Sequence, residues 1–279
     1  MDVALAAEGP GTRETTAAAS VLLEPLVDGP DRPLPVLGRA GGTVHLGTGD
    51  SDVPLVSVTP AGAVRLPASL QLAGPLPDRV ATARAGLGRL LLDTVVVRVR
   101  RWWRPPAPVV RDPRRASARA AAAAPLLPPL EPAVAVAVAP LREAVRSSDA
   151  RPGPTRAVAG LVGLGGGLTP SGDDVLAGAL VALRALERGG HAGPGRLASA
   201  LARAAGRRAT TTLSAALLQD AGRGWCVPEL AAYLAAADGR GELPTAVARL
   251  LAVGHSSGAA MAHGAALVLT TADLRQERA

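Results

Sequence analysis

The stretch GLVGLGGGLTPSGDDVLAGALVAL, residues 160–183, decides how the second half of the chain is interpreted. Glycines crowd its first half, and two adjacent aspartates lead into apolar residues at helical spacing. A Ser-x-x-Asp pattern is typical of a helix start, where the serine accepts a hydrogen bond from the first turn and acids meet the positive end of the helix dipole. We therefore predict a helix that begins near Ser171, with Ser171 as its cap.

The glycines in front of this helix exceed what a capped start requires. Glycine is needed where φ is positive or where the backbone must approach a ligand closely. Known phosphate loops do not match, because the Walker pattern requires a lysine and the chain has none. The dinucleotide pattern G-x-G-x-x-G places its last glycine on Leu168 or Pro170. The glycines predict a ligand-binding loop of another kind, and the alternative is a purely structural loop.

Toward the C-terminus the apolar residues keep a helical spacing, and short glycine-containing loops separate the segments. Six stretches follow this rule: LAGALVALRALERGG, GRLASALARAAGRR, TTTLSAALLQDAG, VPELAAYLAAADGRG, LPTAVARLLAVG and GAAMAHGAALVLTTADL. We therefore predict a helical C-terminal domain over residues 141–279, which carries the glycine loop and the later motif GHSSG.

Toward the N-terminus, residues 21–104 alternate short Val- and Leu-rich runs with frequent Gly and Pro, which predicts an antiparallel β-rich domain. VSVTPAGAVRL is typical of a hairpin with TPAG as its turn. Residues 1–20 are small and polar and are expected to be disordered or frayed. Residues 105–140 are rich in Pro, Arg and Ala and are interpreted as a partly mobile connection. The predicted fold class is α+β, with the β domain first.

The positive charge of the chain is concentrated in one segment, residues 98–119. The chain has 30 Lys plus Arg, 23 Asp plus Glu and a formal net charge of +7. Asp112 alone opposes eight arginines here: Arg98, Arg100, Arg101, Arg104, Arg111, Arg114, Arg115 and Arg119. Three interpretations stay open, namely a solvated connection, a surface for an acidic partner subunit, and a nucleic-acid site. Four prolines between residues 105 and 113 disfavour the last, because they interrupt any helix that would enter a groove.

Other protein classes are excluded by composition. A single cysteine, Cys226, permits neither an internal disulfide nor a cysteine-based zinc site. The N-terminus lacks the basic start and apolar run of a signal peptide, and no apolar run reaches the roughly 18 to 20 residues of a membrane helix. We therefore expect a cytoplasmic protein that does not contact a membrane.

The motif GHSSG, residues 254–258, formally matches the G-x-S-x-G nucleophile elbow of hydrolases, with Ser256 as nucleophile. That elbow follows a strand, whereas the residues before this motif have helical spacing. Too few residues follow for the acid and the histidine of a hydrolase. The motif instead predicts a helix start capped by Ser256 or Ser257, with His255 facing a cleft shared with the glycine loop. The alternative for His255 is a packed, hydrogen-bonded histidine.

A third helix start is predicted at Thr210–Thr212, beside Arg207 and Arg208. Three hydroxyls at a helix beginning can cap the helix or bind an oxyanion, and the arginines could supply a counter-charge. The alternative is a cap with solvated arginines. His263 lies on another face of the final helix and is interpreted as structural.

GLGGGLTPSGDDVLAG followed about eighty residues later by GHSSG resembles the AllH-like family, whose namesake is a component of oxamate carbamoyltransferase. VHLGTGD, LVSVTPAGAVRLP and TTLSAALL stand in the expected order, so the resemblance covers roughly residues 40 to 270. One departure is Gly166, where the family favours proline.

The resemblance implies a subunit of an enzyme that interconverts oxalurate plus phosphate with oxamate plus carbamoyl phosphate, with other carbamoyltransferase subunits as partners. The alternative is a non-catalytic structural subunit. Small oxyanionic substrates suit several helix N-termini that converge on one cleft. Our candidates for substrate binding are Gly165, Gly166, Gly167, Thr169, Ser171, Thr211, Ser256 and Ser257. Our candidates for catalysis are Asp173, Asp174 and His255, and the two aspartates could also bind Mg²⁺.

Overall fold

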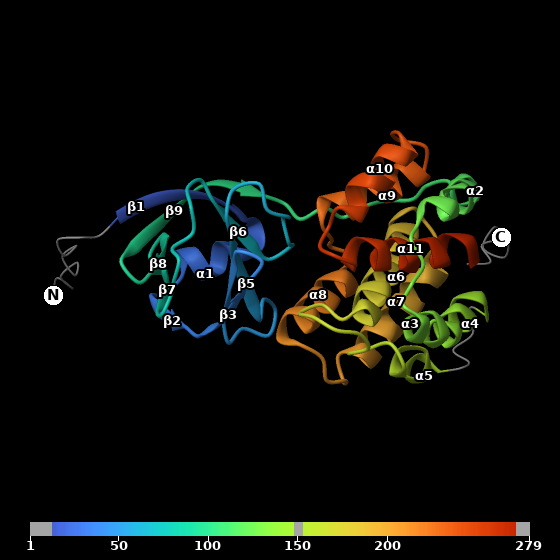
Figure 1. Ribbon diagram of the computed structural model, residues 1–279, viewed down its shortest axis with the longest axis horizontal. Helices are drawn as coiled ribbons and strands as arrows, with labels where there is room; N and C mark the ends of the chain where they lie inside the picture. The colour runs from blue at the N-terminus through green and yellow to red at the C-terminus, as the bar shows by residue number, and fades with distance from the viewer. Residues whose placement is uncertain (1–12, 148–152, 272–279) are drawn as a thin grey trace. The chain divides into compact units, whose positions relative to one another are not determined.

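The computed structural model describes residues 13–147 and 153–271 of the chain. The chain divides into two compact units, Met1–Arg104 and Pro105–Ala279 (Figure 1). The first contains a mixed, mostly antiparallel β-sheet and the second is helical, in agreement with an α+β fold class. No helix of the described residues is long and apolar enough to cross a membrane.

The first unit is built on one sheet with the strand order β2-β7-β8-β9-β1-β6-β5-β4-β3. β1 pairs in parallel with β9, and β5 in parallel with β6, whereas the other neighbours are antiparallel. The strands are β1 (Arg13–Ser20), β2 (Arg32–Leu34), β3 (Val36–Ala40), β4 (Thr43–Gly47), β5 (Leu55–Thr59), β6 (Ser69–Leu72), β7 (Ala83–Gly86), β8 (Arg89–Leu92) and β9 (Val95–Trp103). A short helix, α1 (Glu24–Asp28), packs in the same core.

Two predictions about this unit are wrong. Residues 13–20 are not frayed but form β1, a central strand between β9 and β6. Ala17 and Ala19 of this strand are buried in the core, where small side chains can be packed between neighbouring elements. The rest of the segment expected to be frayed, residues 1–12, lies outside the described residues.

The second error is the hairpin, because β5 and β6 run in parallel, with Ser57 opposite Ser69. The turn residues of TPAG are present, but the chain continues past them and returns before it pairs again. A two-residue turn can join only antiparallel strands. The composition of TPAG correctly predicted a turn, in which the Ala63 amide donates to the carbonyl of Pro60 at 3.3 Å. It incorrectly predicted that the strands on either side pair as an antiparallel hairpin.

The second unit is a cluster of helices around α6. Its helices are α2 (Pro113–Ala123), α3 (Pro132–Ala137), α4 (Ala139–Ser147), α5 (Pro154–Ala159), α6 (Ser171–Arg188), α7 (Ala192–Ala205), α8 (Thr212–Arg223), α9 (Pro228–Ala237), α10 (Leu243–Leu251) and α11 (Ser257–Thr271). Nearly all of α6 is buried, and α7, α8 and α11 pack against it (Figure 1).

Glycines set the distance between α6 and α11. A Cβ atom on Gly178 would lie 2.1 Å from the carbonyl oxygen of Met261, and one on Gly264 would lie 1.9 Å from that of Val175. The two backbones are therefore in direct contact where the helices cross. This close packing fixes the first turns of both helices, which carry the two sequence motifs.

The segment expected to be a mobile connection, residues 105–140, belongs to the helical unit. Val110 donates its amide to the carbonyl of Ala185 at 2.9 Å, and His263 Nε2 donates to the carbonyl of Pro128 at 2.7 Å. Its prolines do not prevent helices, because Pro113 and Pro132 are the first residues of α2 and α3, where a missing N–H costs nothing. His263 is structural, as its position predicted.

Candidate functional site

The glycine loop has an alternating left-handed backbone. Gly163, Gly165 and Gly167 have φ values of +78°, +110° and +87°, a region that residues with side chains seldom adopt. Gly165 is also crowded, because a Cβ atom there would lie 2.8 Å from the amide nitrogen of Ser171. Backbone conformation thus accounts for three of the glycines in this stretch.

Two further glycines differ sharply in their surroundings. A Cβ atom on Gly172 would lie 2.1 Å from the carbonyl oxygen of Leu161, and the Gly172 amide donates to the carbonyl of Leu164 at 2.9 Å. The first turn of α6 therefore packs directly on the loop. Gly166, in contrast, has open space around it and no positive φ.

The predicted cap of α6 is wrong. The N-cap residue is Pro170, which makes no side-chain hydrogen bond, and Ser171 is the first residue of the helix. The Ser171 hydroxyl instead donates to Oε1 of Glu131 at 3.1 Å. Ser171 is 4% exposed, so its only hydroxyl proton is used inside the protein. Glu131 has no sequence signal that would have placed it here.

Asp173 fastens the loop to the start of α8. Its Oδ1 accepts the backbone amide of Gly163 at 2.9 Å, and its Oδ2 accepts the hydroxyl of Thr210. Asp173 is 2% exposed. Because Asp173 is buried and each of its oxygens already accepts a hydrogen bond, it is a poor ligand for the predicted Mg²⁺ site. The described residues contain no group of three or more His, Cys, Asp or Glu that could hold a metal ion.

Asp174 has a different environment from its neighbour. Burial raises its pKa to about 7, hydrogen bonds from Ser257 and Thr169 oppose that rise, and the charge of Asp173 adds to it. Its Oδ2 is buried and has no hydrogen-bond partner among the described residues. Asp174 is therefore a carboxyl group that is roughly half protonated near neutral pH.

The glycine loop and GHSSG lie together. The hydroxyls of Thr169 and Ser257 are 3.0 Å apart and both hydrogen-bond to Asp174. Ser257 is the first residue of α11. His255, two residues earlier, is exposed, and it makes no hydrogen bond to the described residues. Ser256 is half-buried, and its carbonyl accepts the amide of Ala260 at 3.0 Å.

The start of α8 joins the same cluster. Thr211, a candidate for substrate binding, caps this helix, because its hydroxyl oxygen accepts the amide of Ser214 at 3.0 Å. The same hydroxyl donates to the carbonyl of Leu168 in the glycine loop. Arg207 and Arg208 precede this cap and are exposed. The first turns of α6, α8 and α11 thus meet around the glycine loop.

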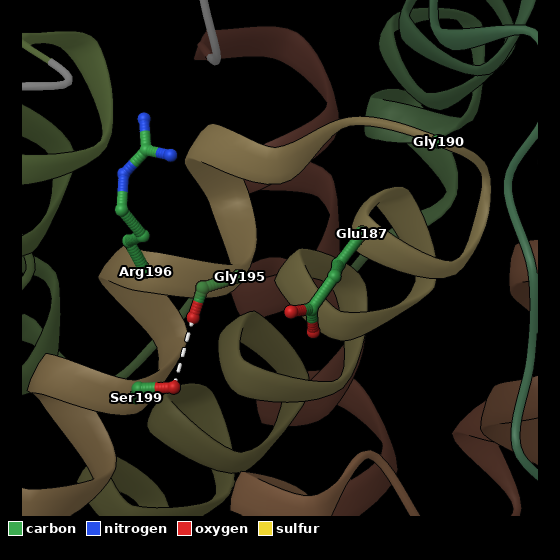
Figure 2. A pocket seen from close by; sticks show the side chains of 5 residues that line it. All are labelled: Glu187, Gly190, Gly195, Arg196 and Ser199. Atoms are coloured by element: carbon green, nitrogen blue, oxygen red, sulfur yellow. Dashed lines mark hydrogen bonds between the residues drawn. The ribbon is translucent and has the colours of Figure 1, made fainter.

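A pocket of about 450 Å³ lies at the opposite end of α6, near its last turn and the first turns of α7 (Figure 2). Glu187, Gly190, Gly195, Arg196 and Ser199 line it. Arg184 pairs with Glu187 at 2.8 Å and donates to Ser199 at 2.9 Å, and Ser199 donates to the carbonyl of Gly195 at 3.0 Å. None of the predicted site residues lines this pocket, and its polar groups largely serve the packing of α6 on α7.

A family model described as oxamate carbamoyltransferase subunit AllH matches residues 161–269, which is less than half of the chain. We call residues 161–269, which are similar to this family, the AllH segment. The AllH segment begins just before the glycine loop and ends within α11, so it contains all three helix starts. No curated protein and no solved structure matched significantly.

Proposed function

We propose that the chain is a carbamoyltransferase subunit that binds a small oxyanionic substrate where α6, α8 and α11 begin. The description of the AllH family supports the first part, because it names a subunit of oxamate carbamoyltransferase. The second part rests on geometry. The AllH segment brings its two motifs and three helix starts into one hydrogen-bonded cluster, joined by Asp173, Thr169 and Ser257.

The cluster offers donors for an oxyanion. The amides of Gly165, Gly166 and Gly167 lie on exposed residues and make no hydrogen bond to the described part of the protein. The first turns of α6, α8 and α11 place the positive ends of three helix dipoles around them. Consecutive amides with alternating backbone conformation form a concave anion site, and helix N-termini strengthen it. Arg207 and Arg208 would add positive charge at its edge.

Asp174 keeps the negative charge of this cluster low. A protonated carboxyl does not repel an oxyanion, whereas two ionised aspartates in the first turn of α6 would. Because the pKa of Asp174 is raised to about 7, its charge develops as the pH rises through neutrality. Substrate binding should therefore weaken above pH 7, in addition to any effect of the substrate's own ionisation.

The cluster also suits the chemistry of carbamoyl transfer. The amide nitrogen of oxamate attacks the carbamoyl carbon, the bond from that carbon to the phosphate oxygen breaks, and phosphate leaves. Negative charge gathers on the carbonyl oxygen during the attack, where the amides of Gly165–Gly167 would stabilise it. His255 is exposed beside the cluster and would accept the proton that this nitrogen loses.

A non-catalytic structural subunit is the second candidate, and the loop itself gives a reason for it. The hydroxyls of Ser171 and Thr211 and both oxygens of Asp173 are used inside the protein. These contacts would also stabilise a loop whose only role is to contact another subunit.

The two candidates are separated by measuring turnover in the complex reconstituted with its partner subunits, with carbamoyl phosphate and oxamate as substrates. In the wild type we expect KM for carbamoyl phosphate to rise as the pH passes through 7, and in Asp174→Asn we expect this rise to be reduced. Ser199→Ala, in the pocket at the other end of α6, is the matched control and should behave as wild type. If Asp174→Asn assembles normally and keeps the wild-type turnover and pH profile, the structural subunit is the better account.

A further inference from the structure

The second half of β9 has one unpaired edge. β8 pairs only with Val95–Val97 of β9, whereas β1 follows β9 as far as Trp103. No strand of the described residues pairs with Arg98–Trp103 on the side that β8 leaves. Ala17 and Ala18 of β1 face Val99 and Arg101, so Arg100 is an extra residue that bulges from the ladder. β9 is therefore paired on both sides over Val95–Val97, and from Arg98 onward it has one free edge and a bulge at Arg100.

This edge is strongly basic and partly aromatic. Arg98 is paired with Glu14 at 3.3 Å, but Arg100, Arg101 and Arg104 are exposed and have no acidic partner among the described residues. Trp102 is 37% exposed, which is unusual for the largest apolar side chain. We call Arg100–Arg104 the β9 patch.

The chain itself offers little negative charge to cover the β9 patch. Residues 105–279 contain 19 arginines against 13 aspartates and glutamates, and a second copy of the whole chain carries +7. Neither is a good electrostatic complement to three unpaired guanidinium groups. Arginines on a strand edge discourage pairing with neutral or basic strands, and the same charges favour an acidic one. Net charge therefore favours an acidic partner over a second copy or the helical unit of this chain.

We propose that the β9 patch docks an acidic segment of another subunit of the enzyme complex, with Trp102 as the apolar anchor of the contact. A polypeptide fits better than a nucleic acid, because the β9 patch has only three unpaired arginines. Further along the basic segment, Arg115 pairs with Asp112 at 3.5 Å and Arg119 donates to the carbonyl of Ala236 at 2.9 Å, so the segment does not continue as an unbroken row of free cations. A phosphate backbone is bound best by a long row of free cations. Tryptophan and arginine are also the residues most enriched at protein–protein contacts.

The test uses the triple variant Arg100→Glu, Arg101→Glu, Arg104→Glu in the full chain, co-expressed with the partner subunits of its own complex. A triple variant of exposed arginines elsewhere, Arg13→Glu, Arg79→Glu, Arg249→Glu, changes the net charge by the same amount and is the matched control. We expect the control to assemble as wild type and the β9 variant to bind its partners at least about tenfold more weakly. We also expect the wild-type Kd to rise with salt. Circular dichroism of each free chain confirms that it is folded.

Two further variants and a nucleic-acid binding assay complete the test. The milder triple Arg→Gln variant of the β9 patch should weaken binding less than the Glu variant, and Trp102→Ala should weaken it without changing its salt dependence. Unchanged Kd values for both β9 triple variants, or no assembly of the wild type with these subunits, would overturn the proposal. Salt-sensitive binding of a 30-nucleotide duplex or single strand to wild type but not to the β9 variant would assign the patch to nucleic acid instead.

Discussion

Replacing Asp174 with asparagine should stabilise the helical unit at pH 8 and leave its stability nearly unchanged at pH 4. Asparagine has the shape of a protonated aspartate, and the hydroxyl oxygens of Thr169 and Ser257 can accept from its amide group. It never carries a charge. The difference between the two proteins therefore measures the free energy that the native fold spends on ionising a buried carboxyl group.

The magnitude follows from the pKa of Asp174, which burial raises from its ordinary 3.8 to about 7. Between these values the native state holds a proton that the unfolded chain has lost, so wild-type stability falls as the pH rises. Each pH unit across this window costs about 1.4 kcal/mol, and three units give about 4 kcal/mol. The cost becomes small near pH 4 and vanishes below the unfolded-state pKa of 3.8, where both states are protonated, and above pH 7 the full cost is present.

Urea unfolding followed by circular dichroism at 222 nm is the suitable assay, because almost all helix lies in residues 105–279. Asp220→Asn is the control. Asp220 is also buried, with a pKa raised to about 7, but it lies two turns into α8, away from the glycine loop. The Asp220→Asn variant should gain stability at pH 8 in the same way as Asp174→Asn, but it should leave turnover unchanged. Equal free energies of unfolding for wild type and Asp174→Asn at pH 8, or a difference that does not shrink toward pH 4, would refute the argument.

Five other variants test single positions. Gly172→Ala should lower the free energy of unfolding by about 1–3 kcal/mol, because its Cβ would meet a carbonyl oxygen at 2.1 Å, whereas Gly166→Ala should leave it within about 0.5 kcal/mol by the same urea assay. Gly264→Ala should lower the free energy of unfolding at least as much as Gly172→Ala, because it pushes two helix backbones apart. It should also speed amide hydrogen exchange along α11. Thr210→Val leaves a buried oxygen of Asp173 unpaired and should cost about 1–3 kcal/mol in urea unfolding. His255→Gln should keep the wild-type melting temperature, because the side chain is exposed, and lower kcat by about a hundredfold or more in the reconstituted complex.

Local patterns predicted the helical unit better than the sheet. Apolar spacing and glycine punctuation identified α6 to α11, and the threonines were recognised as the start of α8, where Thr211 is the cap. Helices are local, so these signals lie within a few residues of one another. The sheet depends on pairing between distant segments. The direction of β5 against β6 and the central place of β1 could not be read from turn residues or from side-chain size.

The candidate site divides along the same line. The sequence indicated that the glycine loop and GHSSG were related, and the structure places Thr169 against Ser257. The partners that decide each residue's chemistry came from elsewhere in the chain. Ser171 was predicted to cap α6 but bonds to Glu131, forty residues earlier, because a proline already occupies the cap position. No periodicity or spacing in the sequence connects those two residues.

The paired aspartates show why the loop needs both acids and yet can receive an anion. Asp173 accepts two hydrogen bonds, which tie the loop to α6 and α8 and leave it no free oxygen. Asp174 faces α11 and has one buried oxygen without a partner among the described residues, so its charged form is disfavoured. Adjacent residues on a helix point about 100° apart, which allows such different surroundings for neighbouring side chains. One aspartate thus holds the loop in place, and the other carries only part of its negative charge at neutral pH. Asp173→Asn should loosen the loop, because an asparagine has only one side-chain oxygen to accept the two hydrogen bonds from Gly163 and Thr210. Asp174→Asn should not loosen it, because Asp174 makes neither of these contacts.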